Sequence, residues 1–224
     1  MAVFLLSSPR FGMLAERAVE RSAEFSPDAL AAIVFSAFWV EAFVNEVIHQ
    51  VTIGREDLLP DEAVRRLRQL AIAADLDGRD SRLDVKVQVI ATSLTGSPFV
   101  TGRQPYQDFH LLTGLRNDLV HHKPETVKEV LVEHEGSPLS IPEALHSRIK
   151  SLVSRGIIAE PDPKVFWSLV AILEQPSVAR WAFDAAKQMI RAVANCFPAP
   201  GDRQLLLGGQ WALKEKGATS GDSS

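Results

Sequence analysis

Cysteine is almost absent from this chain of 224 residues, which contains one thiol. The single residue, Cys196, excludes an intramolecular disulfide and a cysteine-rich metal cluster, and it fits a reducing compartment. We expect Cys196 to lie in a helix as a small apolar residue. The sequence also lacks a glycine-rich phosphate loop, because Gly54, Gly78 and Gly96 stand alone as turn residues.

A large excess of charge of either sign is also absent. The formal net charge is −4 and the sequence pI is near 5.9. A protein that binds nucleic acid over a broad surface needs a cationic one, so any contact with RNA would be local. His49, His134 and His146 fall in unrelated segments, and we therefore expect neither a metal site nor a cofactor.

No segment is expected to cross a membrane. The apolar start at residues 3–6 has no basic residue before it and is too short for a signal core. No other run approaches the length of a membrane span. We therefore expect a cytoplasmic protein with no membrane partner.

The apolar residues that are present suffice for one sizeable core. Hydrophobic residues make up 46% of the chain, and a chain of this length forms one such core. We expect an all-α domain over residues 1–198 and a flexible, polar tail over residues 199–224. Caps and apolar periodicity predict helices over residues 26–51, 60–76, 106–123, 162–174 and 176–198.

Two segments are harder to assign. In residues 82–94 the valines alternate as in a strand, while a second apolar pattern repeats every three or four residues as in a helix. Residues 124–162 are punctuated by proline and glycine. They are predicted to form an irregular insertion before the last two helices, not an element of the core.

A compact group of polar residues lies in the helix predicted over residues 106–123. At about 100° per residue, Leu112, Leu115 and Leu119 form an apolar stripe. The opposite face carries His110, Gly114, Asn117 and His121. Gly114 leaves room there for another backbone or a ligand to approach, and Arg116, at the edge of the apolar stripe, can reach either side.

The helix over residues 26–51 contains a carboxylate among apolar residues. The stripe that includes Leu30 and Ile48 has Glu41 near its centre and Asn45 beside it. A carboxylate there is costly unless it is paired, and we expect Arg116 to be its partner through two hydrogen bonds. The helix is apolar nearly all round, so something must cover both faces, and a second copy of the chain would do so.

The stretch Leu115–Pro124 resembles the signature of the HEPN superfamily, an arginine and a polar residue followed a few positions later by histidine near a helix end. Phe35–Ile48 is similar to the long apolar first helix of that superfamily, and Val178–Val193 to its closing helix. The resemblance covers residues 26–123 and 177–197. It implies an up-and-down helical bundle and favours a helix over residues 82–94.

The resemblance implies a metal-independent endoribonuclease that works as a homodimer, with RNA as its substrate. It also suggests a toxin of a toxin–antitoxin system or an antiviral defence effector, with an antitoxin as a possible protein partner. His121 would transfer protons, Arg116 would bind the scissile phosphate, and Asn117 would orient His121 or the phosphate. Glu41 and Asn45 would support them, and His110 and His122 are lesser candidates.

Simpler interpretations stay open. Arg116 is also explained as a salt-bridged structural residue, and His121 as a favourable residue at a helix C-terminus. For Glu41 a structural ion pair fits better than catalysis. The alternative function is a non-catalytic helical module that dimerises through its first helix and binds a protein through residues 125–160.

Overall fold

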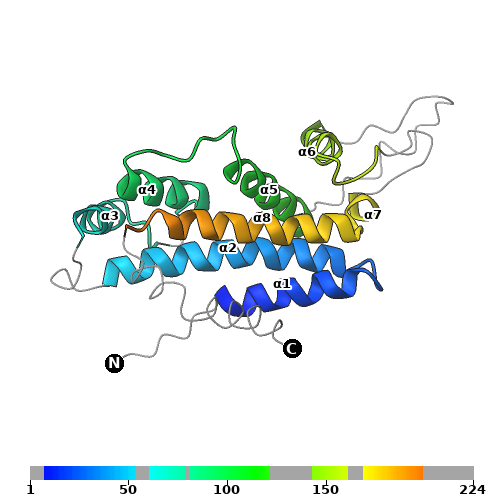
Figure 1. The fold of residues 1–224 in the computed structure, drawn as a ribbon, viewed down its shortest axis with the longest axis horizontal. Helices are drawn as coiled ribbons and strands as arrows, with labels where there is room; N and C mark the ends of the chain where they lie inside the picture. The colour runs from blue at the N-terminus through cyan, green and yellow to red at the C-terminus, as the bar shows by residue number, and fades with distance from the viewer. Residues whose placement is uncertain (1–7, 54–60, 79–80, 122–142, 161–168, 199–224) are drawn as a thin grey trace, which may run out of the picture. The chain divides into compact units, whose positions relative to one another are not determined.

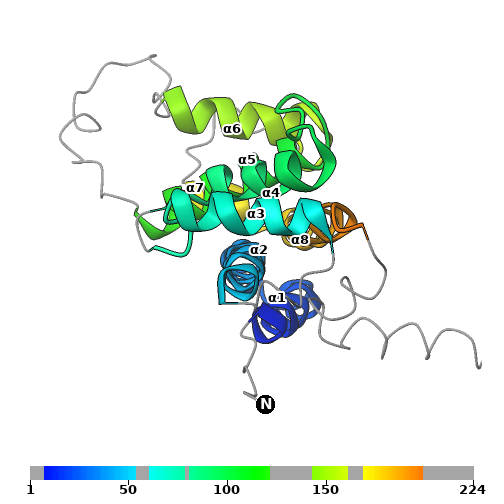
Figure 2. The same ribbon diagram turned by 90° about the vertical axis from the view of Figure 1, so that its left-hand side faces the viewer.

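The computed structural model describes residues 8–53, 61–78, 81–121, 143–160 and 169–198. Over these residues the chain forms eight helices and no strand, which confirms the predicted all-α class. The helices, labelled in Figures 1 and 2, are α1 (Ser8–Ser22), α2 (Asp28–Ile53), α3 (Glu62–Ala73), α4 (Leu83–Thr95), α5 (Tyr106–Val120), α6 (Glu143–Ser154), α7 (Leu169–Leu173) and α8 (Pro176–Asn195).

Most predicted helices are present, with small differences at their ends. Of the helix predicted over residues 162–174, the structure shows α7, and residues 162–168 lie outside the described residues. The ambiguous segment 82–94 is helix α4, closed by Gly96 in a left-handed conformation with φ of 79°. Helix α3 begins where Asp61 accepts a hydrogen bond from the Ala63 backbone N–H at 2.7 Å. Helix α5 ends at Val120 and not at residue 123, and the predicted tail over residues 199–224 lies outside the described residues.

Helix α1 was not predicted, because its buried face consists of small residues. The buried positions are Ser8, Gly12, Ala15, Ala18 and Ser22. Of its larger apolar residues, Met13 and Leu14 are 54% and 40% exposed, and Phe11 and Val19 are only half-buried. A search for large apolar residues at helical spacing therefore misses it.

The chain divides into two compact units, and helices α1, α2, α5 and α8 contribute to both. Unit 1 comprises residues Met1–Phe11, Phe38–Gln107 and Lys187–Ser224, and unit 2 comprises Gly12–Ala37 and Asp108–Ala186. In unit 1, α3 packs on α4, and Glu46 of α2 accepts a hydrogen bond from the Ser8 backbone N–H at 2.9 Å. The Glu46 carboxylate thereby caps the first turn of α1.

Unit 2 is held together by close contact between helices with small side chains. Ala18 of α1, Ala29 and Ala32 of α2, and Ala179 of α8 form one buried cluster. Because these side chains are single methyl groups, the helix axes can approach more closely than they could across leucines. Helix α5 contributes the fully buried Leu112 and Leu115 to the same unit.

The prediction that residues 124–162 are irregular is wrong for their second half. Residues 143–154 form α6, and a Gly156 with φ of 67° follows its end. Ile149, Leu152 and Ile158 are at most 4% exposed. Proline and glycine lie near the ends of this helix and do not interrupt it, so they do not indicate irregularity across the whole segment. The first half lies outside the described residues.

Two further predictions are wrong, namely that no run approaches the length of a membrane span and that Cys196 lies within a helix. By length and composition, α2 is the one described helix that is apolar enough to cross a membrane, and half of its most apolar stretch is buried inside the protein. Cys196 is buried, but it lies one residue beyond the end of α8, where its thiol donates to the Ala192 carbonyl at 3.3 Å.

If α6 belongs to the core of unit 2, removing a buried side chain from it must destabilise the protein. Leu152→Ala is expected to lower the free energy of unfolding by roughly 2–5 kcal/mol, because it leaves a cavity at a fully buried position. Urea unfolding monitored by circular dichroism measures this change. The exposed Lys150 on the same helix supplies the control, since Lys150→Ala should change stability by less than about 0.5 kcal/mol. Equal stability of the two variants would contradict a core role for α6.

Candidate functional site

Helix α5 presents the predicted polar face to solvent. His110, Asn117 and His121 are exposed, while Leu112 and Leu115 are fully buried on the other side. The predicted division of this helix into an apolar and a polar face is therefore confirmed, although Leu119 is only half-buried. His121 lies one residue beyond the helix end, and its backbone N–H donates to the Asn117 carbonyl at 2.9 Å. This bond keeps His121 close to the last turn.

Arg116 is held to the neighbouring amide side chain. Its Nη1 donates to Asn117 Oδ1 at 2.8 Å. Arg116 is half-buried and Asn117 is exposed, so the bond draws the guanidinium from the edge of the core toward the polar face of α5. The family resemblance predicts that Asn117 orients His121 or a phosphate. In the structure its side-chain oxygen orients Arg116.

The space above Gly114 is occupied by an arginine from α6. A Cβ atom added at Gly114 would lie 2.7 Å from Arg148 Nε and 3.1 Å from its Cζ. The same guanidinium forms an ion pair with Asp118, one turn further along α5. The prediction that Gly114 permits a close approach is confirmed, and the group that approaches is Arg148.

A second arginine joins the segment after α6 to the start of α5. Arg155 forms an ion pair with Asp108, which lies in the first turn of α5 and is 8% exposed. Burial lowers the pKa of Arg155 from its ordinary value, and the guanidinium is still charged at neutral pH. Two Arg–Asp ion pairs therefore connect α5 to α6 and the residues that follow it.

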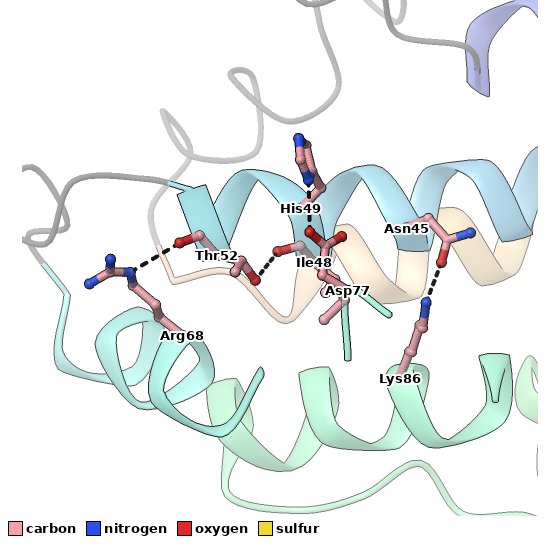
Figure 3. Close-up of polar contacts among 7 residues, drawn as sticks. All are labelled: Asn45, Ile48, His49, Thr52, Arg68, Asp77 and Lys86. Atoms are coloured by element: carbon pink, nitrogen blue, oxygen red, sulfur yellow. Dashed lines mark hydrogen bonds and ion pairs between the residues drawn. The ribbon is translucent and has the colours of Figure 1, made fainter. Parts of the chain in front are cut away.

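Asn45 and Glu41, the predicted supporting residues, interact with a lysine of α4 in unit 1. Asn45 Oδ1 accepts a hydrogen bond from Lys86 Nζ at 2.7 Å (Figure 3). The charges of Asp77 and Glu41 also act on Lys86. The predicted ion pair between Glu41 and Arg116 would join unit 1 to unit 2 and stays a prediction.

The sequence predicts that Glu41 lies near the centre of the buried face of α2. In the structure it lies at the edge of that face. It is half-buried, as is Leu30 of the predicted stripe. The buried positions are Ala29, Ala32, Ile33, Ser36, Ala37, Val40, Phe43, Val44, Val47, Ile48 and Val51. These residues follow a spacing of three and four, which turns Glu41 to the edge of the core.

Lys86 is the most deeply buried charged residue of this polar network, and the sequence analysis missed it. It is 6% exposed, and the charges of Glu41 and Asp77 act on it. Burial lowers the pKa of Lys86, and the two carboxylates partly oppose that shift. Asp77 also accepts from His49 Nδ1 at 3.0 Å (Figure 3). A helical wheel for residues 83–95 would have placed Lys86 on the side of Ile90 and Ser93, which are buried too.

The remaining predicted site residues add little. His122 lies outside the described residues, and His110 is exposed on α5. Within the described part of the chain, no group of three or more histidine, cysteine, aspartate or glutamate side chains could hold a metal ion. A hollow of about 320 Å³ in unit 1 is lined by Arg65, Arg68, Gln69, Ile72 and Ala73, and none of these was a predicted site residue.

Comparison with known proteins identifies no relative. No family model, no curated protein and no solved structure matches the chain. The resemblance to the HEPN superfamily thus rests on the α5 motif and on the helices around it.

The Lys86 environment leads to a prediction about alkaline pH. In the unfolded chain the pKa of Lys86 returns to about 10.5, whereas burial lowers it in the folded protein. Between these two values the unfolded chain binds more protons, so the contribution of Lys86 to stability rises with pH. Compared with Lys86→Met, the wild type should therefore gain free energy of unfolding as the pH is raised from neutrality toward 10.5.

Urea unfolding of both proteins across this pH range provides the measurement. Every other titrating group is common to the two proteins and cancels in the difference. A difference that stays constant or falls with pH would show that burial does not control the protonation of Lys86.

Proposed function

We propose that this protein is a metal-independent endoribonuclease of the HEPN type and that the polar face of α5 carries the reaction. The observation that carries the proposal is the hydrogen bond from Arg116 to Asn117, which draws a guanidinium toward the exposed face that bears His121. An arginine and an accessible histidine at one helix end supply a cation and a proton carrier together.

The chemistry needs no cofactor, because RNA contains its own nucleophile. His121 accepts the proton of the 2′-hydroxyl, whose oxygen attacks the adjacent phosphorus. The bond from phosphorus to the 5′-oxygen breaks, and a proton is delivered to that leaving oxygen. Arg116 stabilises the negative charge that builds on the phosphate oxygens. The products are a 2′,3′-cyclic phosphate and a 5′-hydroxyl.

A homodimer would complete the site. The reaction needs a base on one side of the phosphorus and an acid on the other. In one chain, His121 is the histidine at the end of α5 that carries Arg116. A second copy of the chain would supply the other histidine. In the cell such an enzyme would act as a toxin or an antiviral effector, restrained by a protein partner.

A second candidate function is a non-catalytic helical module that binds a partner protein. The observation in its favour is the ion pair of Asp118 with Arg148, which uses a residue of the α5 motif to connect α5 with α6. The exposure of His121 favours the enzyme, because a purely structural motif does not need an accessible imidazole.

Cleavage of a mixed cellular RNA pool in excess EDTA tests the enzyme. The wild type should yield 2′,3′-cyclic phosphate ends, and Arg116→Ala and His121→Ala should each lower the rate at least about 100-fold. Gln107→Ala is the matched control, because it removes an exposed polar side chain from the first turn of the same helix. It should change the rate less than about threefold.

Cleavage that survives both Arg116→Ala and His121→Ala would remove the assigned site. Cleavage that requires a divalent metal would contradict the mechanism. If the folded wild type leaves RNA intact, the partner-binding module becomes the better account.

The composite site also predicts an oligomeric state. Sedimentation equilibrium should give about twice the 24.6 kDa mass of one chain at micromolar concentration. A protein that cleaves RNA as a strict monomer would show that one α5 motif is sufficient.

A further inference from the structure

Arg148 is placed on α5 by the absence of a side chain at Gly114. Its Nε, Cζ and Nη2 atoms would lie 2.7, 3.1 and 3.3 Å from a Cβ atom at that position. The guanidinium thus lies against the backbone of α5, where any other residue would displace it. Gly114 shares the polar face with His110, Asn117 and His121, so the charge of Arg148 is brought to that face.

Asp118 holds the same guanidinium from the next turn of α5. The side chains of Arg148 and Asp118 are 29% and 27% exposed, so the pair is partly open to solvent. Unpaired, the Asp118 carboxylate would repel an anionic ligand beside Arg116 and His121. The ion pair cancels that charge. Since a guanidinium has five N–H donors, the bond from Nη1 to Asp118 leaves others to bind a ligand.

Helix α6 leaves the α5 motif accessible. Asn117 and His121 are exposed although Arg148 and Arg155 both reach α5. Arg148 therefore lies next to an open surface. At this position it can bind a ligand together with the α5 motif and does not block access to that motif.

We propose that Arg148 is a second phosphate-binding residue of the RNA site on α5, held in position by Asp118 and by the space above Gly114. The inference rests on the proposed ribonuclease function. Arg116 would bind the scissile phosphate, and Arg148, whose planar fork suits phosphate oxygens, would bind a neighbouring phosphate of the same strand.

Binding of a 2′-O-methyl RNA oligonucleotide tests this role, since such RNA lacks the nucleophile and cannot be cleaved. Arg148→Gln should raise Kd about tenfold, as expected for one charge-assisted hydrogen bond. It should also reduce the slope of log Kd against log salt concentration by about one phosphate contact. Lys150→Gln removes an exposed charge from the same helix and should leave Kd within about twofold.

Two further variants separate binding from folding and from simple neutralisation. Gly114→Ala keeps every charge but displaces the guanidinium, so it should weaken binding as Arg148→Gln does. The double variant Arg148→Gln with Asp118→Asn keeps the net charge of the pair at zero and leaves no unpaired carboxylate. It should still bind weakly, with the reduced salt slope.

Each result distinguishes this inference from the proposed function. If the double variant recovers wild-type affinity, Arg148 serves only to neutralise Asp118 and the inference is overturned. It is also overturned if Arg148→Gln binds normally while Arg116→Ala is inactive, and the ribonuclease proposal then stands. If the wild type neither binds nor cleaves RNA, both proposals fail together.

Discussion

The buried stripe of α2 is the constraint on which both units depend. Its buried positions recur every three or four residues from Ala29 to Val51, and the helix contributes residues 28–37 to unit 2 and residues 38–53 to unit 1. In unit 2 the stripe begins with alanines, which permit close packing with α1 and α8. In unit 1 the polar residues Glu41 and Asn45 fall at its edge, where Asn45 accepts a hydrogen bond from Lys86 and the charge of Glu41 acts on that lysine. The direction of each polar side chain follows from which side of α2 is buried.

The parts of the fold that could be predicted are those that local periodicity determines. Helices α2, α5 and α8 each have an apolar pattern of three and four within a single segment. For α4 the local pattern fits a strand as well as a helix, and only the family resemblance favours the helix. The same pattern correctly separated the two faces of α5. Helix α1 could not be predicted in this way, because its buried face consists of glycine, serine and alanine. These small residues contribute little to any apolar pattern.

The ion pairs that shape the candidate site could not be predicted, because their partners lie 30 residues or more apart. The sequence shows that Gly114 permits a close approach, but it does not show that Arg148 is the approaching group. The Asp118 carboxylate has several possible partners until tertiary structure selects one. Lys86 was missed for a different reason, since a lysine on a short helix is expected on the solvated side.

The pairing order also determines how α5 and the segment from α6 are connected. Asp108 at the start of α5 pairs with Arg155, and Asp118 near its end pairs with Arg148, so the two segments run antiparallel. Ten residues of helix separate the two carboxylates, a distance of about 15 Å along the axis. Two attachments this far apart resist rotation of α6 about α5, which one attachment would allow.

The buried thiol has a practical consequence. Cys196 is the one cysteine of the chain and lies directly after α8. A thiol reagent can modify it only when the end of α8 opens, so the labelling rate reports the free energy of that local opening. The protein thus contains a single-site chemical probe of its own dynamics, with no substitution needed to introduce one.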